Sequence, residues 1–162
     1  MPDAATVRLR PMTQEEYATY RAGSERDYAL EMAASGQLDL EAAEKRSALE
    51  FAELLPDGLD SPRMHLWTAE AGDPAEPVGL GWIELRQRPS GSTAWVYDIS
   101  VDAARRGQGL GRAVMEALHE AARDLGATSI ALNVFGHNTT AIHLYESLGY
   151  AVTAQQMKRD LT

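Results

Sequence analysis

With 162 residues, 44% of them hydrophobic and 24% charged, the chain has the size and composition of one globular domain, which argues against a disordered, collagen-like or coiled-coil protein. It has no cysteine, so disulfides, thiolate metal sites and a cysteine nucleophile are excluded as well. It has 15 lysines and arginines and 24 aspartates and glutamates, and the net charge of −9 disfavours nucleic acid or an anionic membrane as a partner. This charge would suit a cationic acceptor such as an amine; the alternative, which the composition favours, is an ordinary charged surface.

The first part of the chain is expected to be mainly helical. Residues 7–10 (VRLR) predict a short strand before the helices begin. Thr13 and Glu16 have the spacing of a capping box, which starts a helical stretch that ends at Gly36. The sequence predicts an interruption of this stretch near Gly23.

The middle of the chain changes from helix to strand. Asp39 is expected to cap a second helix that ends near Leu55, and a turn-rich connector follows over 56–62. Runs rich in β-branched and aromatic residues then predict three strands, over 65–71, 78–86 and 93–101.

The last third alternates between helix and strand. Its periodicity predicts a helix over 110–125, a strand over 129–135, a short helix over 138–148 and a final strand over 150–160. The order of elements gives an α/β fold with a mixed, mostly antiparallel sheet. One strand–helix–strand crossover should join two parallel strands.

A glycine-rich loop over 105–112 (RRGQGLGR) is the clearest chemical signal. The helix after it has no side chain at the usual cap position, so its first N–H groups, the helix dipole and three arginines describe an anion site. A Walker loop is excluded because no lysine is present, and a dinucleotide fingerprint is excluded because position 112 is arginine. The alternative is a glycine-rich turn with surface arginines.

The spacing Arg106-x-x-Gly109-x-Gly111 after the strand YDISV resembles the acetyl-CoA loop of the GNAT superfamily of N-acetyltransferases. A second segment, from Asn138 through Tyr145 to Gly149-Tyr150, is similar to the closing motif of that family. The resemblance implies a single domain over 1–162 with six to seven strands, helices on both faces and a splayed central strand pair. It also implies a variable acceptor side over 11–62 and an acetyl-CoA core over 93–150.

By this resemblance, the loop amides hold the pyrophosphate of acetyl-CoA. The loop residues expected to bind are Arg106, Gly107, Gln108, Gly109, Gly111 and Arg112. A β-bulge is expected near Ser100, with the main chains of Ile99 and Val101 pairing with the pantetheine arm as an added strand would. Asn133 and Asn138 are expected beside the cofactor, although Asn138 also stands where an N-cap belongs.

Two residues are candidates for catalysis. Tyr145 resembles the tyrosine that faces the CoA sulfur; the alternative is a core tyrosine. Asp98 is the first choice of base and Glu84 the second, since position 133 holds asparagine where some relatives carry a glutamate base. Strict alternation points Asp98 away from Tyr97, and a bulge would reverse this.

The sequence therefore predicts an acetyl-CoA-dependent N-acetyltransferase in which a primary amine attacks the thioester directly in a ternary complex. Two alternatives stay open: a catalytically silent acyl-CoA-binding domain, and an interaction domain that binds no CoA. The acceptor is a small-molecule or peptide amine that the sequence does not specify, and a homodimer is left open. No metal is implied. Without an apolar leader or a membrane-length apolar run, a cytoplasmic protein is expected.

Overall fold

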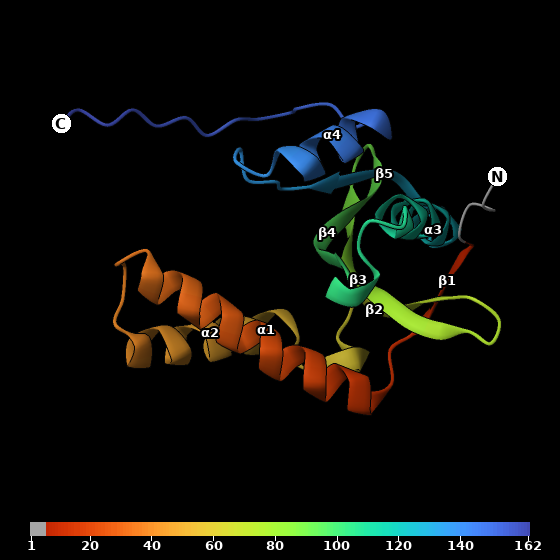
Figure 1. The fold of residues 1–162 in the computed structure, drawn as a ribbon, viewed down its shortest axis with the longest axis horizontal. Helices are drawn as coiled ribbons and strands as arrows, with labels where there is room; N and C mark the ends of the chain where they lie inside the picture. The colour runs from red at the N-terminus through yellow and green to blue at the C-terminus, as the bar shows by residue number, and fades with distance from the viewer. Residues whose placement is uncertain (1–5) are drawn as a thin grey trace. The chain divides into compact units, whose positions relative to one another are not determined.

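Five strands form one sheet in the order β1-β2-β3-β4-β5 in the computed structural model, which describes residues 6–162 (Figure 1). The strands are β1 Val7–Pro11, β2 Met64–Ala71, β3 Glu76–Arg88, β4 Gly91–Val101 and β5 Ala127–Leu132. The first four are antiparallel neighbours, whereas β4 and β5 are parallel, which confirms the expected mixed sheet. The sheet belongs to a first compact unit that ends at Leu132, and Asn133–Thr162 forms a second.

Three helices cover the two faces of this sheet (Figure 1). They are α1 Gln14–Ala34, α2 Leu40–Leu54 and α3 Leu110–Asp124. Beneath α1 and α2 lies a core that includes Tyr17, Leu66 and Trp82. Beneath α3 lies another that includes Val78 and Val114. The predicted helices on both faces are therefore present.

The capping box at the start of α1 is confirmed. The Thr13 hydroxyl accepts from the Glu16 N–H at 3.1 Å, and the Glu16 carboxylate accepts from the Thr13 N–H at 2.9 Å. Arg10 also donates to Glu16 at 2.7 Å, and this bond lowers the pKa of the carboxyl to about 2. The start of α1 is therefore defined both by its own capping residues and by Arg10 of β1.

The predicted interruption near Gly23 is wrong, because α1 runs unbroken through it. A glycine inside a helix costs only about 1 kcal/mol, and burial of the apolar face offsets that cost. Tyr17 and Met32, on either side of Gly23, are both buried. Helix α1 ends at Ala34, close to the end expected at Gly36. Asp39 caps α2, as predicted, by accepting from the Ala42 N–H at 2.8 Å.

The expected count of six to seven strands is wrong for the described residues, which contain five. The strand predicted over 150–160 is absent: these residues form neither helix nor strand, and Val152 and Met157 are exposed there. A strand requires a ladder partner, and side-chain preference does not supply one. The strand predicted over 129–135 ends at Leu132.

The second unit contains one helix, α4 Thr139–Ser147. Asn138 is its N-cap and accepts from the Ala141 N–H at 3.2 Å. Across the described part of the chain, no helix has the length and apolar character needed to cross a bilayer.

Gly79 is expected to be the least replaceable glycine of β3. A Cβ there would lie 2.2 Å from the Ser100 carbonyl oxygen on β4, a backbone atom that cannot turn away. We expect Gly79→Ala to lower the free energy of unfolding by about 1–3 kcal/mol, measured by urea unfolding. Gly81→Ala is the control, because its Cβ would meet only the Leu118 side chain at 3.3 Å. Equal losses in the two variants would contradict this view of the strand contact.

Candidate active site

A β-bulge in β4 decides which way its side chains face. Asp98 pairs with Trp82 while Val96 pairs with Ile83, so Tyr97 is the extra residue. The bulge expected near Ser100 therefore lies three positions earlier, at Tyr97. Its location depends on the pairing with β3, which the sequence of β4 alone does not show.

The bulge turns two consecutive side chains to the same face. Tyr97 stacks on Trp82 with ring centroids 4.7 Å apart, under α1 and α2. The Tyr20 hydroxyl of α1 donates to Asp98 Oδ2 at 2.7 Å, so Asp98 lies on this face as well. Ile99 packs in the core beneath α3. Strict alternation would have placed Asp98 opposite Tyr97, and the bulge reverses it.

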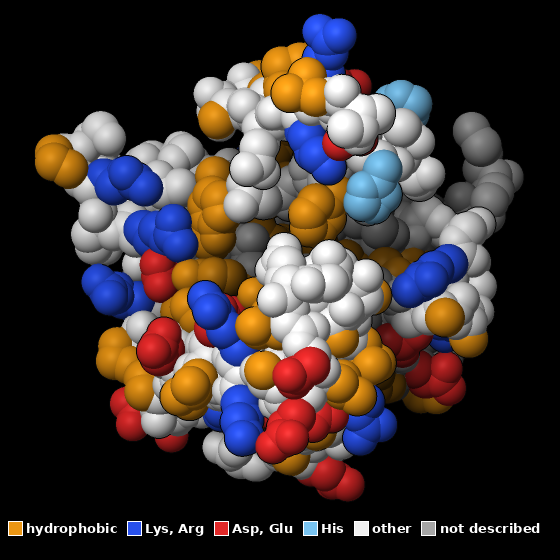
Figure 2. Space-filling model, turned by 90° about the vertical axis from the view of Figure 1, so that its left-hand side faces the viewer, with side chains coloured by type: hydrophobic (Ala, Val, Ile, Leu, Met, Phe, Trp, Pro, Cys, Tyr) orange, Lys and Arg blue, Asp and Glu red, His pale blue; other side chains and the backbone are white. Residues whose placement is uncertain are grey.

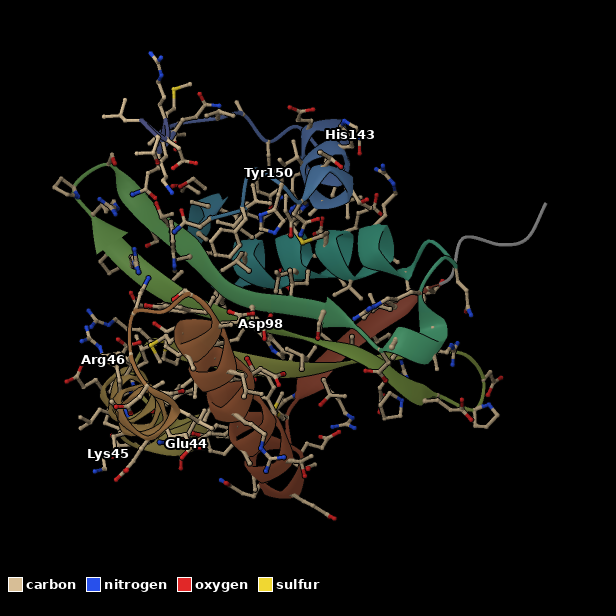
Figure 3. All side chains as sticks on the ribbon, turned by 60° about the vertical axis from the view of Figure 1, so that its left-hand side comes forward. Glu44, Lys45, Arg46, Asp98, His143 and Tyr150 are labelled. Carbon is tan, nitrogen blue, oxygen red and sulfur yellow. The ribbon has the colours of Figure 1, made fainter. Side chains whose placement is uncertain are left out.

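Asp98 is a largely buried carboxyl group. Figure 3 labels it on the side of β4 that faces α1. Burial raises the pKa of Asp98, and the hydrogen bonds from Tyr20 and the Ile99 N–H oppose the rise. Burial and the nearby Asp98 charge also raise the pKa of Tyr20, which keeps this hydroxyl a donor. A carboxyl with a raised pKa is a stronger base than an exposed one.

Tyr20 is the contact that sequence reasoning missed. The only signal was its position three residues after Tyr17 on the apolar side of α1, which indicates burial and no particular partner. Tyr20 and Asp98 are 78 positions apart in the sequence, and they meet only because α1 packs onto the sheet.

The second-choice base, Glu84, is held in an ion pair. Arg86 Nε donates to Glu84 Oε1 at 2.6 Å, and Arg86 Nη2 donates to the Tyr97 hydroxyl at 3.2 Å. The guanidinium also lies 4.6 Å from the centre of the Trp95 ring. Asp98, which has no cationic partner among the described residues, is therefore the better candidate for accepting a proton.

The second half of β4 has an edge that β5 does not cover. Pairing between these strands runs from Ser92 to Val96, where β5 ends. The Asp102 N–H donates to the Val78 carbonyl at 2.8 Å, so Asp102 faces β3. By alternation, the main-chain groups of Val101 and Ile99 face the other edge. Arg106 Nε donates to the Val101 carbonyl at 3.3 Å, in agreement with this direction.

The glycine-rich loop leads from that edge to the N-terminus of α3. Gly107 and Gly109 have φ of +79° and +74°, values that favour glycine, and a Cβ on either would meet nothing within 4 Å. Gly109 is the N-cap residue of α3, and no side chain caps the helix. Leu110 and Gly111 therefore begin α3 with N–H groups that no capping side chain occupies.

Other side chains of the loop are tied to the protein. Arg105 donates to Gln108 at 3.4 Å and forms an ion pair with Glu76 at 3.6 Å. Arg106 is hydrogen-bonded to the end of β4. The loop therefore combines arginine side chains held in place with main-chain N–H groups that no side chain caps. This combination of uncapped amides, helix dipole and nearby cations is suited to an anion such as a phosphate.

The remaining predicted site residues lie in the second unit. Asn133 directly follows β5 and is exposed, so the expectation that it lies on the strand is wrong. Tyr145 lies on α4, with its ring centroid 5.6 Å from that of Tyr150. Burial, with Tyr145 close by, raises the pKa of Tyr150. Figure 3 labels Tyr150 and His143 of this unit.

The first unit thus brings together most of the predicted residues, from Asp98 to Arg112. Asn133, Asn138 and Tyr145 belong to the second unit. In the part of the chain that the structure describes, no three His, Cys, Asp or Glu side chains are grouped as metal ligands.

Comparison with known proteins agrees with this arrangement. The model of the acetyltransferase (GNAT) family matches residues 26–150. Two Bacillus subtilis (strain 168) proteins named as uncharacterized N-acetyltransferases are similar over nearly their whole length. YdgE is 33% identical over 94% of this chain and 97% of its own, and YycN is 35% identical over 96% and 99%.

A crystal structure of B. subtilis YycN superimposes with a TM-score of 0.85 at 34% identity, covering 97% of this chain and 99% of that one. The residues that the family model matches include the glycine-rich loop and β4. The chain belongs to the acetyltransferase (GNAT) family. It is accordingly an enzyme of the N-acetyltransferase class, as the resemblance of its loop implied.

Proposed function

We propose that the chain transfers the acetyl group of acetyl-CoA to a primary amine while both substrates are bound. The observation that carries this proposal is the uncapped start of α3 behind Gly107 and Gly109, at the end of a strand edge that β5 leaves open. Uncapped amides suit the pyrophosphate, and the main chain of Ile99 and Val101 suits an extended arm that pairs as a strand. Acetyl-CoA is the acetyl donor that this family generally uses.

The chemistry assigned to the site needs no covalent enzyme intermediate. The neutral amine nitrogen attacks the thioester carbonyl, the new C–N bond forms, and the C–S bond breaks. Main-chain N–H groups of β4 polarise the carbonyl oxygen. Asp98 takes the amine proton, directly or through water, and Tyr145 hydrogen-bonds the departing sulfur. A raised pKa suits Asp98 to this task.

The absence of a glutamate at position 133 favours weakly basic acceptors. An α-amine with a pKa of ~7.7–8.0 loses only about 1–1.4 kcal/mol to protonation at pH 7, whereas an alkyl amine with a pKa of ~10.4 loses roughly 4.6 kcal/mol. A site whose base is one buried carboxylate has a smaller free-energy cost to overcome when it deprotonates an α-amine than when it deprotonates an alkyl amine. We therefore propose an α-amine as the acceptor, of a small molecule or a peptide.

The rival function is a domain that binds acyl-CoA without turnover, and the asparagine at position 133 is the observation in its favour. Two measurements separate it from the proposal. Calorimetry with acetyl-CoA tests binding, and release of the CoA thiol in the presence of an amine panel tests transfer. Binding without thiol release would favour the rival; no binding would overturn both.

Gly109→Asp is expected to weaken acetyl-CoA binding at least tenfold, about 1.4 kcal/mol. The new carboxylate stands beside the first amides of α3, where it competes with and repels the pyrophosphate. Calorimetry measures the change. Gly126→Asp is the matched control, because Gly126 also has a positive φ of +90° and open space but lies at the other end of α3. Unchanged affinity in a folded Gly109→Asp protein would contradict the assignment of the loop.

A further inference from the structure

Arg86 lies on the same face of the sheet as Asp98 and is fixed in place by three neighbours. Glu84 accepts from its Nε, the Tyr97 hydroxyl accepts from its Nη2, and its guanidinium lies over the Trp95 ring. Such contacts reduce the number of conformations that an arginine side chain can adopt. They leave it pre-organised for binding.

One edge of this guanidinium remains open. Glu84 accepts from Nε, and the Tyr97 hydroxyl accepts from one of the two N–H groups of Nη2. Nη1 has no hydrogen bond or ion pair among the described residues, so both terminal nitrogens keep an N–H group for a further acceptor. The side chain of Arg86 is 33% exposed, against 18% for Glu84. Two parallel N–H groups are the arrangement that binds a carboxylate through both its oxygens.

The separation from Asp98 limits the size of what can reach both groups. Asp98 pairs with Trp82, four residues before Arg86 on β3, so the two positions are about 13 Å apart along the sheet at ~3.3 Å per residue. The Arg86 side chain reaches back to Tyr97, the residue next to Asp98, which shortens the distance. Two or three extended peptide residues span ~7–11 Å.

We propose that Arg86 binds a carboxylate of the acceptor, so that the acceptor is a short peptide or similar molecule that carries both an α-amine and a carboxylate. This inference rests on the proposed function, which places the amine at Asp98. Figure 2 shows acidic and basic side chains interspersed in the lower part of the view, where Figure 1 places α1 and α2. The chain as a whole has a net charge of −9, which repels a purely anionic molecule more than one that carries both charges.

The test compares di- and trialanine with their C-terminal amides, which differ only in the carboxylate. Calorimetry in the presence of CoA measures peptide binding without acetyl transfer, and thiol release from acetyl-CoA measures kcat/KM. We expect the parent protein to favour the free acids at least tenfold in both measurements. Arg86→Gln should abolish this preference.

Arg88→Gln is the matched control. It removes the same charge two residues further along β3, at a position that is exposed, and it should retain the preference for the acids. Equal binding of acids and amides by the parent, or a preference that survives Arg86→Gln, would overturn the role of Arg86. If only amines without a carboxylate are acetylated, that role is overturned while the proposed function stands. If acetyl-CoA neither binds nor reacts, the proposed function fails, and peptide binding still decides on Arg86.

Discussion

Asp98→Asn is expected to lower kcat/KM by about 10²–10⁴-fold, the range that a positioned general base contributes. The substitution keeps the shape of the side chain, and the amide oxygen can still accept from the Tyr20 hydroxyl at the 2.7 Å contact. What it removes is the capacity to take a proton from the amine. Steady-state thiol release with an α-amine acceptor measures the loss.

The stability of the same variant should move the other way. Because the pKa of Asp98 is raised in the folded protein, ionisation there destabilises the fold. That penalty is absent below the unfolded pKa of ~3.9 and grows as the pH rises through the folded pKa. Asparagine carries no charge, so Asp98→Asn should match or exceed the parent in the free energy of unfolding at pH 7. The difference should disappear at low pH.

Asp102→Asn supplies the control, since Asp102 lies just past the end of β4 and is exposed. It should leave both activity and stability close to the parent. If Asp98→Asn keeps full activity, Asp98 is not the base. If it loses activity and stability together, the carboxylate serves the fold instead of the reaction.

The parts of this protein that sequence predicts well are those that neighbouring residues decide. Thr13 and Glu16 define the start of α1 within four residues. The loop around Gly107 and Gly109 can be predicted from the sequence because a positive φ favours glycine. The uncapped start of α3 can be predicted as well, because no residue there has a capping side chain. The anion-binding features of the site are therefore local, and so is their signal.

The parts that sequence did not predict depend on pairing between distant segments. The bulge lies at Tyr97 because of the register between β4 and β3, and that register turns Asp98 toward α1. Tyr20 meets Asp98 across 78 positions. The prediction of a final strand over 150–160 was wrong for the same reason, because it depended on pairing with another strand. The preference of these residues for β structure does not supply that partner. The contact between Tyr20 and Asp98 is consequently what the structure adds to the candidate site.

Tyr145→Phe is expected to lower kcat by roughly 10²-fold while acetyl-CoA affinity changes little, measured by thiol release and calorimetry. A phenol with a pKa near ~10 gives its proton to the thiolate of a thiol near ~8.5 only uphill, by roughly 2 kcal/mol. A hydrogen bond to the sulfur as the C–S bond breaks is therefore the role assigned to the hydroxyl, and phenylalanine removes it without changing the ring.

Tyr150→Phe is the matched control for this substitution. Its ring lies 5.6 Å from that of Tyr145 in the same unit, so it reports a general disturbance of that region. The two variants should differ in kcat, with the large loss confined to Tyr145→Phe. If Tyr145→Phe keeps its kcat and loses Tm, the hydroxyl stabilises the fold, because a core tyrosine contributes to stability and a group that acts only on the leaving sulfur contributes to the rate.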